Sequence, residues 1–235
     1  MAMNINENVN TLRPIYDFPL PSLEDDHGSR GLVYRAILSG SRVLDVGCDT
    51  GRFGEVLRIQ KNCTVDGVEP YLPAAEVAQT RLNQVFIRAI DNEKSFNGLI
   101  NYDAILFLDV LEHLQNPWAV IKGAMKVLQP GGAIHIVVPN IAHISVVRRL
   151  LQGRFEYSNC GTMDRTHLRW FTRKSLSESL EEAGFEKILI DVVAQVPYLY
   201  TKSAISDFLV NQLVRFFPDP IAGSIIGYAI KSRLK

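Results

Sequence analysis

Two acidic residues and two glycines at fixed spacing point most directly to chemistry in this sequence. Asp45 ends an apolar run, Gly47 and Gly51 follow it, and Glu69 ends the next apolar run. Glycines permit a tight turn that brings backbone close to a ligand, and a carboxylate at the tip of the following strand accepts ribose hydroxyls. The spacing therefore predicts a nucleoside site at the edge of a doubly wound sheet.

Two classes of nucleoside cofactor compete for this pattern. A nicotinamide dinucleotide site uses G-x-G-x-x-G around a pyrophosphate, and counted from Gly47 that motif fails at Asp49 and Arg52. Asp45 and Asp49 would also repel a pyrophosphate. A cofactor that lacks phosphate and carries a positive charge agrees better with two acids. S-adenosylmethionine (SAM) has a sulfonium, an ammonium, a ribose and an adenine, and it is the cofactor we expect.

The spacing D-x-G-x-x-x-G, followed by an acid at the next strand, resembles motif I of the class I SAM-dependent methyltransferases. Residues 102–117, Y-D-A-I-L-F-L-D-V-L-E-H-L-Q-N-P, are similar to the fourth strand and exit loop of this family. Residues 128–140, L-Q-P-G-G-A-I-H-I-V-V-P-N, are similar to its Pro-Gly-Gly turn and fifth strand. Residues 153–172 resemble a subgroup of small-molecule methyltransferases that accompany bacterial glycosyltransferases or make quinones.

The resemblance implies an α/β fold: a Rossmann-like, doubly wound, seven-stranded and mostly parallel sheet with helices on both faces and an antiparallel seventh strand. It implies transfer of the SAM methyl group to a small-molecule acceptor, with S-adenosyl-L-homocysteine as product. We expect the acceptor atom to be an oxygen of a sugar, a glycolipid precursor or a quinone-like compound. N- or C-methylation is the alternative within the class, and a non-catalytic SAM-binding partner or regulatory subunit is the alternative outside it.

Apolar runs alternate with helical periodicity along the chain, which predicts parallel strands covered by helices. We expect residues 1–27 to be a flexible lead-in and residues 28–235 to form one domain, with a lid or acceptor segment at about 140–171. Strands are expected at 43–46, 64–68, 85–89, 104–108, 134–138, 187–196 and 225–231, and helices at 31–38, 53–59, 73–80, 118–128, 141–151, 173–183 and 208–217.

The expected cofactor site draws on four loops. Asp45 organises the glycine turn and the amino-acid end of SAM, and Glu69 accepts both ribose hydroxyls; the alternative for each acid is a capping role. Many family members have an aspartate where this chain has Ala89, so the adenine would rely on Ile90 or Asp91 instead. The full set of expected cofactor-binding residues is Asp45, Gly47, Cys48, Asp49, Gly51, Glu69, Pro70, Ile90, Leu108 and Asp109.

A hydroxyl nucleophile needs a general base, for which His167, His143 and Asp109 are the candidates. His167 lies in D-R-T-H-L-R-W-F, which combines charge, a base and aromatic rings. The alternative for this stretch is a structural lid in which Asp164 pairs with a neighbouring arginine. His113 and His135 are expected to be packed, hydrogen-bonded residues.

Composition narrows the range of partners. Formal net charge is zero, with 25 basic and 25 acidic residues and no long basic run, so we expect no nucleic-acid partner. Cys48, Cys63 and Cys160 are too few and scattered for a disulfide framework or a metal site, and a cytoplasmic protein is expected. The apolar stretch 198–230 is either a membrane-surface helix for a lipid-linked acceptor or a core helix and last strand. The oligomeric state is not indicated.

Overall fold

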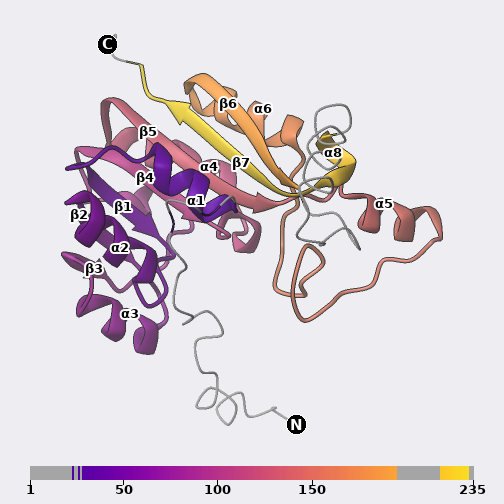
Figure 1. The fold of residues 1–235 in the computed structure, drawn as a ribbon, viewed down its shortest axis with the longest axis horizontal. Helices are drawn as coiled ribbons and strands as arrows, with labels where there is room; N and C mark the ends of the chain where they lie inside the picture. The colour runs from indigo at the N-terminus through magenta and orange to yellow at the C-terminus, as the bar shows by residue number, and fades with distance from the viewer. Residues whose placement is uncertain (1–22, 24–25, 27, 195–217, 233–235) are drawn as a thin grey trace.

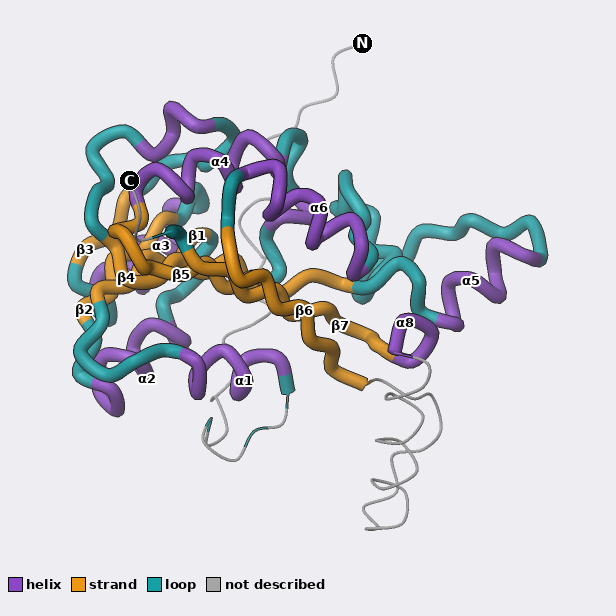
Figure 2. The backbone as a smooth tube through the Cα atoms, turned by 90° about the horizontal axis from the view of Figure 1, so that it is seen from above, coloured by secondary structure: helices purple, strands orange, loops and turns teal. Residues whose placement is uncertain are grey.

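The computed structural model describes residues 23, 26, 28–194 and 218–232, with the side chain of residue 194 excepted (Figure 1). Most of the expected lead-in, 1–27, and the whole expected helix at 208–217 lie outside the described residues. A single sheet runs through the molecule between two layers of helices, with α4 and α6 on one face and α1 and α2 on the other (Figure 2).

The sheet has seven strands in the order β3-β2-β1-β4-β5-β7-β6. The strands from β1 to β5 pair in parallel, and β7 is antiparallel to both β5 and β6. The predicted fold class is therefore confirmed, including the antiparallel seventh strand. The strands are β1 (Arg42–Val46), β2 (Thr64–Val68), β3 (Gln84–Phe86), β4 (Tyr102–Leu108), β5 (Leu128–Pro139), β6 (Glu186–Ala194) and β7 (Ala222–Ile230).

Alternating side chains of the central strands fill two cores, as a sheet covered on both faces requires. Ile105 and Phe107 of β4 belong to the core under α4 and α6, and Ala104 and Leu106 belong to the core under α1 and α2. The helices are α1 (Ser29–Ala36), α2 (Arg52–Lys61), α3 (Leu72–Gln79), α4 (Pro117–Val127), α5 (Ile144–Leu151), α6 (Arg173–Ala183) and α8 (Pro218–Ile221), with 3₁₀ turns η1 (Glu93–Phe96) and η2 (Leu111–His113).

The Pro-Gly-Gly segment differs from the prediction of a turn before a short strand. Strand β5 begins directly after α4, and it takes in residues 128–133 before the expected start at 134. Gly131 donates its N–H to the carbonyl of Lys231, and Lys231 donates to the carbonyl of Gly132. The pairing with β4 shifts register at this point, so the segment is an irregular beginning of the strand.

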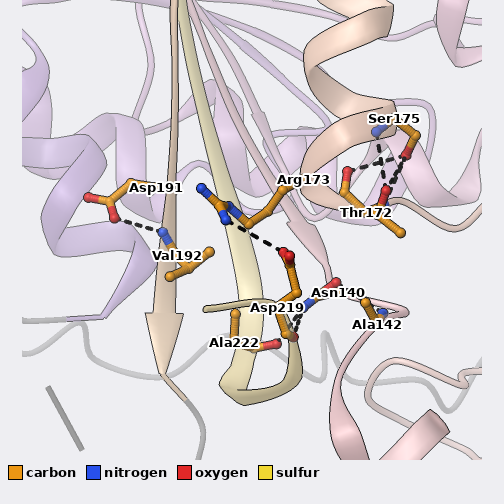
Figure 3. A network of polar contacts seen from close by, with 9 residues as sticks. All are labelled: Asn140, Ala142, Thr172, Arg173, Ser175, Asp191, Val192, Asp219 and Ala222. Atoms are coloured by element: carbon orange, nitrogen blue, oxygen red, sulfur yellow. Dashed lines mark hydrogen bonds and ion pairs between the residues drawn. The ribbon is translucent and has the colours of Figure 1, made fainter. Parts of the chain in front are cut away.

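A polar network fixes the chain where it leaves the sheet after β5 (Figure 3). Asn140 is fully buried, and its Nδ2 donates to the carbonyls of Asp219 and Ala222 at 2.7 and 2.9 Å. Its Oδ1 accepts from the N–H of Ala142 at 3.0 Å. Arg173, the first residue of α6, lies 3.7 Å from the Asp219 carboxylate. The start of the segment expected to form a lid is thus tied to α8 and β7.

All three cysteines are free, as expected. Among the described helices, none is long and apolar enough to cross a membrane. The C-terminal part of the apolar stretch 198–230 is the buried strand β7, which agrees with the interpretation as a last strand, and most of the remainder lies outside the described residues.

Candidate functional site

The glycine turn after β1 has the backbone that the motif requires. Gly47 and Gly51 have φ of 71° and 76°, and Asp49 between them has φ of 49°, a left-handed conformation that aspartate adopts more readily than most residues. The N–H groups of Gly47 and Cys48 donate to the carbonyl of Val68 at 2.8 and 3.2 Å. The turn is therefore bound to the end of β2, which brings it beside Glu69.

Glu69 uses both carboxylate oxygens to hold this edge together. One oxygen accepts the N–H of Asp49 at 3.0 Å, and the other accepts the N–H of Tyr71 at 2.8 Å. Burial raises the pKa of Glu69, and the two amide donors oppose that shift. Because each carboxylate oxygen has a second lone pair, both can still accept hydroxyl groups from a ribose.

Asp45 lies beneath the turn and is only 3% exposed. Burial raises its pKa to about 7; Arg30 lowers it, while Glu69 and Asp49 raise it further. An ammonium group in the site would favour the charged form of this acid. The protonated amino group of SAM would supply the positive charge that balances Asp45, Asp49 and Glu69, so the residues present fit the cofactor.

A cavity of about 640 Å³ opens beside the turn at the carboxyl ends of the parallel strands. Of the expected cofactor-binding residues, Gly47, Glu69, Pro70, Ile90 and Asp109 line it. The other five expected residues do not line the cavity: Asp45, Cys48, Asp49, Gly51 and Leu108. The Cys48 thiol is instead buried in the core, where a Cβ at Gly67 would come within 2.6 Å of its sulfur.

The end of the cavity expected to hold adenine is lined by Arg88, Ala89, Ile90 and Asp91. Strand β3 ends at Phe86, earlier than the predicted 85–89, so these residues form a loop. The Asp91 carboxylate already accepts the Ser95 hydroxyl at 2.8 Å. Arg88 was not predicted to be part of the site; its Nε and one terminal nitrogen are buried without a partner in the described structure.

Asp109 at the mouth of β4 meets a residue that the sequence did not single out. Its carboxylate pairs with Arg30 of α1 at 3.1 Å. Asp109 has φ of 61°, which is unusual for a residue other than glycine, and its N–H donates to Val137 of β5. No motif predicts Arg30, because it contributes only through a contact between segments far apart in the chain.

Glu112 in η2 is buried, and neither carboxylate oxygen has a partner among the described residues. Burial, with a smaller contribution from the Asp109 charge, raises its pKa to about 8. The backbone carbonyl of Glu112 accepts the N–H groups of Leu168 and Arg169 at 2.7 and 3.0 Å. These bonds hold the expected lid against the mouth of the cavity, which Leu168 also lines.

His113 and His167 meet beside Glu112. Their ring centroids are 4.8 Å apart in an edge-to-face contact, and burial followed by the His167 charge lowers the pKa of His113. His113 is hydrogen-bonded to the Thr166 carbonyl and packed against His167, as expected, but it is also partly open to solvent and lines the cavity. Glu112, His113 and His167 each offer a ligand atom within 4.8 Å of the others, which is compatible with a shared proton or a metal ion, although no metal was predicted.

The other two histidines have structural positions. His143 precedes α5, and its Nδ1 accepts the N–H of Ser145 at 3.3 Å as a helix cap; it does not line the cavity. His135 is buried against Tyr228, as predicted, and burial lowers its pKa to about 4. Asp164 accepts hydrogen bonds from the Thr166 N–H and hydroxyl, and the ion pair with a neighbouring arginine that the alternative of a structural lid included is not formed in the described structure.

Comparison with known proteins identifies the family. Residues 28–190 match the family model described as a methyltransferase domain. This chain is a class I SAM-dependent methyltransferase. The family match covers the glycine turn, the Glu69 edge and the histidine pair, and SAM is the cofactor that these enzymes use. The enzyme is thereby distinguished from the nicotinamide dehydrogenase that the glycine turn first allowed.

Several relatives are ubiquinone biosynthesis O-methyltransferases. The one from Dechloromonas aromatica is 32% identical over 183 residues, which cover 76% of this chain and 78% of the relative. The one from Pseudomonas aeruginosa is 31% identical over 113 residues, so this chain spans about half of its length, 47%. Among solved structures, a SAM-dependent methyltransferase from Archaeoglobus fulgidus has a TM-score of 0.60 at 18% identity and covers 88% of this chain and 97% of its own. At this level of identity, the similarity to the solved structure shows a shared fold and nothing more.

Proposed function

We propose that this methyltransferase acts on an oxygen of a small molecule, and that the acceptor is a quinone-like compound, a sugar or a glycolipid precursor. The observation that carries the proposal is the pair His113–His167 beside the cavity, with buried Glu112 behind it. A neutral hydroxyl is a weak nucleophile that must lose its proton on methylation, whereas a neutral amine is nucleophilic enough to have less need of a base. The names of the relatives, O-methyltransferases of ubiquinone biosynthesis, support the same choice.

When bound, SAM would provide an activated methyl group, with S-adenosylhomocysteine as the product. Glu69 and Asp45 would hold the cofactor by its ribose and its amino-acid end, and the turn at Gly47 would allow close approach. The acceptor oxygen would form a bond to the methyl carbon as the carbon–sulfur bond breaks with its electron pair left on sulfur, and the hydroxyl proton would pass to the histidine pair. Both histidines place Nδ1 near a backbone carbonyl, Thr166 for His113 and Thr162 for His167, so each Nδ1 carries a hydrogen and each Nε2 is free to accept a proton.

Of the three bases expected from sequence, we retain His167 as the principal candidate. It acts through His113, which lines the cavity whereas His167 does not. Asp109 lines the cavity but is paired with Arg30, and we place it second. His143 serves as a helix cap, and we assign it no part in catalysis.

The test is an acceptor screen with purified protein and SAM, in which S-adenosylhomocysteine and methylated product are both measured. The screen contains catechols with and without a polyprenyl tail, sugar nucleotides and lipid-linked sugars, and a matched set of amines. We expect turnover with a hydroxyl acceptor and the label from methyl-deuterated SAM on oxygen. Label on nitrogen or carbon would overturn the choice of oxygen and leave the family assignment intact.

A further inference from the structure

Helix α5 and the loop that follows it stand away from the rest of the molecule. Figures 1 and 2 agree in placing α5 at the far end from β2 and β3, beyond the sheet. Val146 and the capping His143 are buried at its base, whereas each residue from 148 to 157 is exposed. These ten residues are the second half of α5 and the start of the following loop. Their exposure is unusual because the apolar side chains of α5 are gathered on one side of the helix, and such a side is normally buried.

One face of α5 is apolar and largely exposed. Ile144, Val147 and Leu151 recur at spacings of three and four residues, which places them on one face of a helix, and Leu150 lies beside them. Leu151 is 83% exposed, and Ile144 and Leu150 are about half exposed. A surface helix of a globular protein normally packs such a face against the core. Because this face is left exposed, it is available for a partner.

Two aromatic side chains extend this surface. Phe155 and Tyr157 are each about half exposed, and their rings meet edge to face with centroids 5.4 Å apart. Tyrosine, which has an apolar ring and a polar hydroxyl, is favoured at the level of lipid headgroups, and phenylalanine adds apolar area beside it. We call Ile144, Val147, Leu150, Leu151, Phe155 and Tyr157 the α5 surface.

The charges around the α5 surface are positive. Arg148 and Arg149 are exposed, and they belong to the same helix as the apolar residues, between Val147 and Leu150 in the sequence. Arg154 forms two bonds to Glu156, at 3.0 and 2.7 Å, so the one acid in this stretch is neutralised. An amphipathic helix with basic residues beside its apolar face is complementary to an anionic lipid surface.

The α5 surface lies at the functional edge of the sheet. Strand β5 ends at Pro139, and the buried Asn140 anchors the chain there before α5 begins (Figure 3). After the exposed loop the chain returns to Leu168, which lines the cavity. A membrane bound by α5 would therefore lie at the carboxyl edge of the sheet, the edge at which the cavity is also found.

We propose that the α5 surface docks this enzyme on an anionic lipid bilayer. The helix lies at the headgroup level, with its leucines and aromatic rings in the bilayer and its arginines near the phosphates. The acceptor is then amphiphilic and stays in the membrane while its head enters the cavity; this role of the acceptor rests on the proposed function, whereas docking does not.

The test is co-sedimentation of the full chain with phosphatidylcholine vesicles, with or without phosphatidylglycerol. We expect the protein to sediment with the anionic vesicles and to stay in solution with the neutral ones. The double variant Leu150→Glu/Leu151→Glu should remain in solution with both. Arg148→Gln/Arg149→Gln should weaken binding to the anionic vesicles by about thirtyfold, because each basic residue near an anionic surface contributes about 1 kcal/mol to membrane binding.

The matched control is Leu38→Glu/Ile59→Glu, which changes two apolar residues that are 77% and 76% exposed elsewhere on the molecule. This variant should sediment like the parent. Titration with SAM checks that every variant is folded, and its result is independent of docking. Failure of the parent to sediment, or sedimentation that Leu150→Glu/Leu151→Glu leaves unchanged, would overturn the proposal. So would a dimer in light scattering that the same variant dissociates, because the surface would then be covered by a second copy.

Discussion

His113 and His167 come from segments far apart in the chain, yet their rings meet edge to face with centroids 4.8 Å apart. Two features bring them together: the bonds from Leu168 and Arg169 to the Glu112 carbonyl, and the bond of each Nδ1 to a nearby threonine carbonyl. A pair held in this way has fixed tautomers before any acceptor binds. Fixed orientation is what a proton acceptor needs, since reaction geometry is sensitive to small displacements.

His167→Ala should lower kcat by ~10²–10⁴ with a hydroxyl acceptor at saturation, which is the usual contribution of a general base. SAM affinity should stay within about twofold, because His167 does not line the cavity. Single-turnover kinetics and calorimetric titration measure the two quantities. The control is His143→Asn, which keeps a good cap on α5 and should retain full turnover. Near-normal turnover of His167→Ala would remove this residue from the mechanism.

The pKa of Asp45, raised by burial to about 7 from 3.8, makes the stability of the free enzyme depend on pH. Between these two pH values the folded state binds more protons than the unfolded state. The stability that the protonated Asp45 carboxyl contributes is therefore complete below about pH 4 and is lost as pH rises through 7. One pKa unit corresponds to about 1.4 kcal/mol, which gives a loss of up to roughly 4 kcal/mol. Asp45→Asn should flatten this part of the curve in urea unfolding at several pH values.

SAM should bind more tightly as pH rises toward 7, because its ammonium favours the ionised form of Asp45. Asp45→Asn should lose this slope in calorimetric titration. Glu182→Gln, at an exposed position of α6, is the control and should keep both the slope and the unfolding profile. An unchanged slope in Asp45→Asn would mean that another acid of the site titrates in its place.

The sequence predicts the parts of the site that depend on local spacing. The turn at Gly47, the acid at Glu69 and the loop at Ile90 follow from strand ends and from their order along the chain, and the structure places all three on the cavity. Spacing does not reveal where each side chain of the turn points: Cys48 is in the same turn, yet its thiol is buried in the core against Gly67.

Contacts between distant segments could not be predicted in this way. Arg30 reaches Asp109 only because α1 packs over the end of β4, and no period in the sequence reports that contact. His113 and His167 meet through an irregular loop, whose path is set by single hydrogen bonds to Glu112. The start of β5 at Leu128 could not be predicted either, because glycine and proline in a sequence indicate a turn and do not reveal a strand irregularity.

Glu69→Ala should weaken SAM binding by about a hundredfold or more. It removes two acceptors for the ribose, and a hydrogen bond to a charged group contributes roughly 1.5–3 kcal/mol. It also frees the N–H groups of Asp49 and Tyr71, so the melting temperature must be measured beside the calorimetric titration. Glu76→Ala, at an exposed position on α3, is the control and should bind normally. Tight binding by folded Glu69→Ala would exclude the ribose role.

Gly47→Ala tests the close approach of backbone and ligand. A Cβ at this position would lie 2.7 Å from a methyl group of Val110, and the φ of 71° is unfavourable for alanine by roughly 1–2 kcal/mol. Gly40→Ala is a matched control: its φ is 76°, but its Cβ would meet no atom within 4 Å. Both variants should lose stability in urea unfolding, and only Gly47→Ala should lose SAM binding as well.

The double variant Gly47→Ala/Val110→Ala separates the two causes of that loss. If displacement of Val110 into the cavity is what blocks the cofactor, removing its methyl groups should restore a large part of the affinity while the cost in φ remains. If affinity stays low in the folded double variant, the new Cβ itself occupies space that the cofactor needs. Equal affinity of the parent, Gly47→Ala and Gly40→Ala would show that the turn at Gly47 does not contact the cofactor.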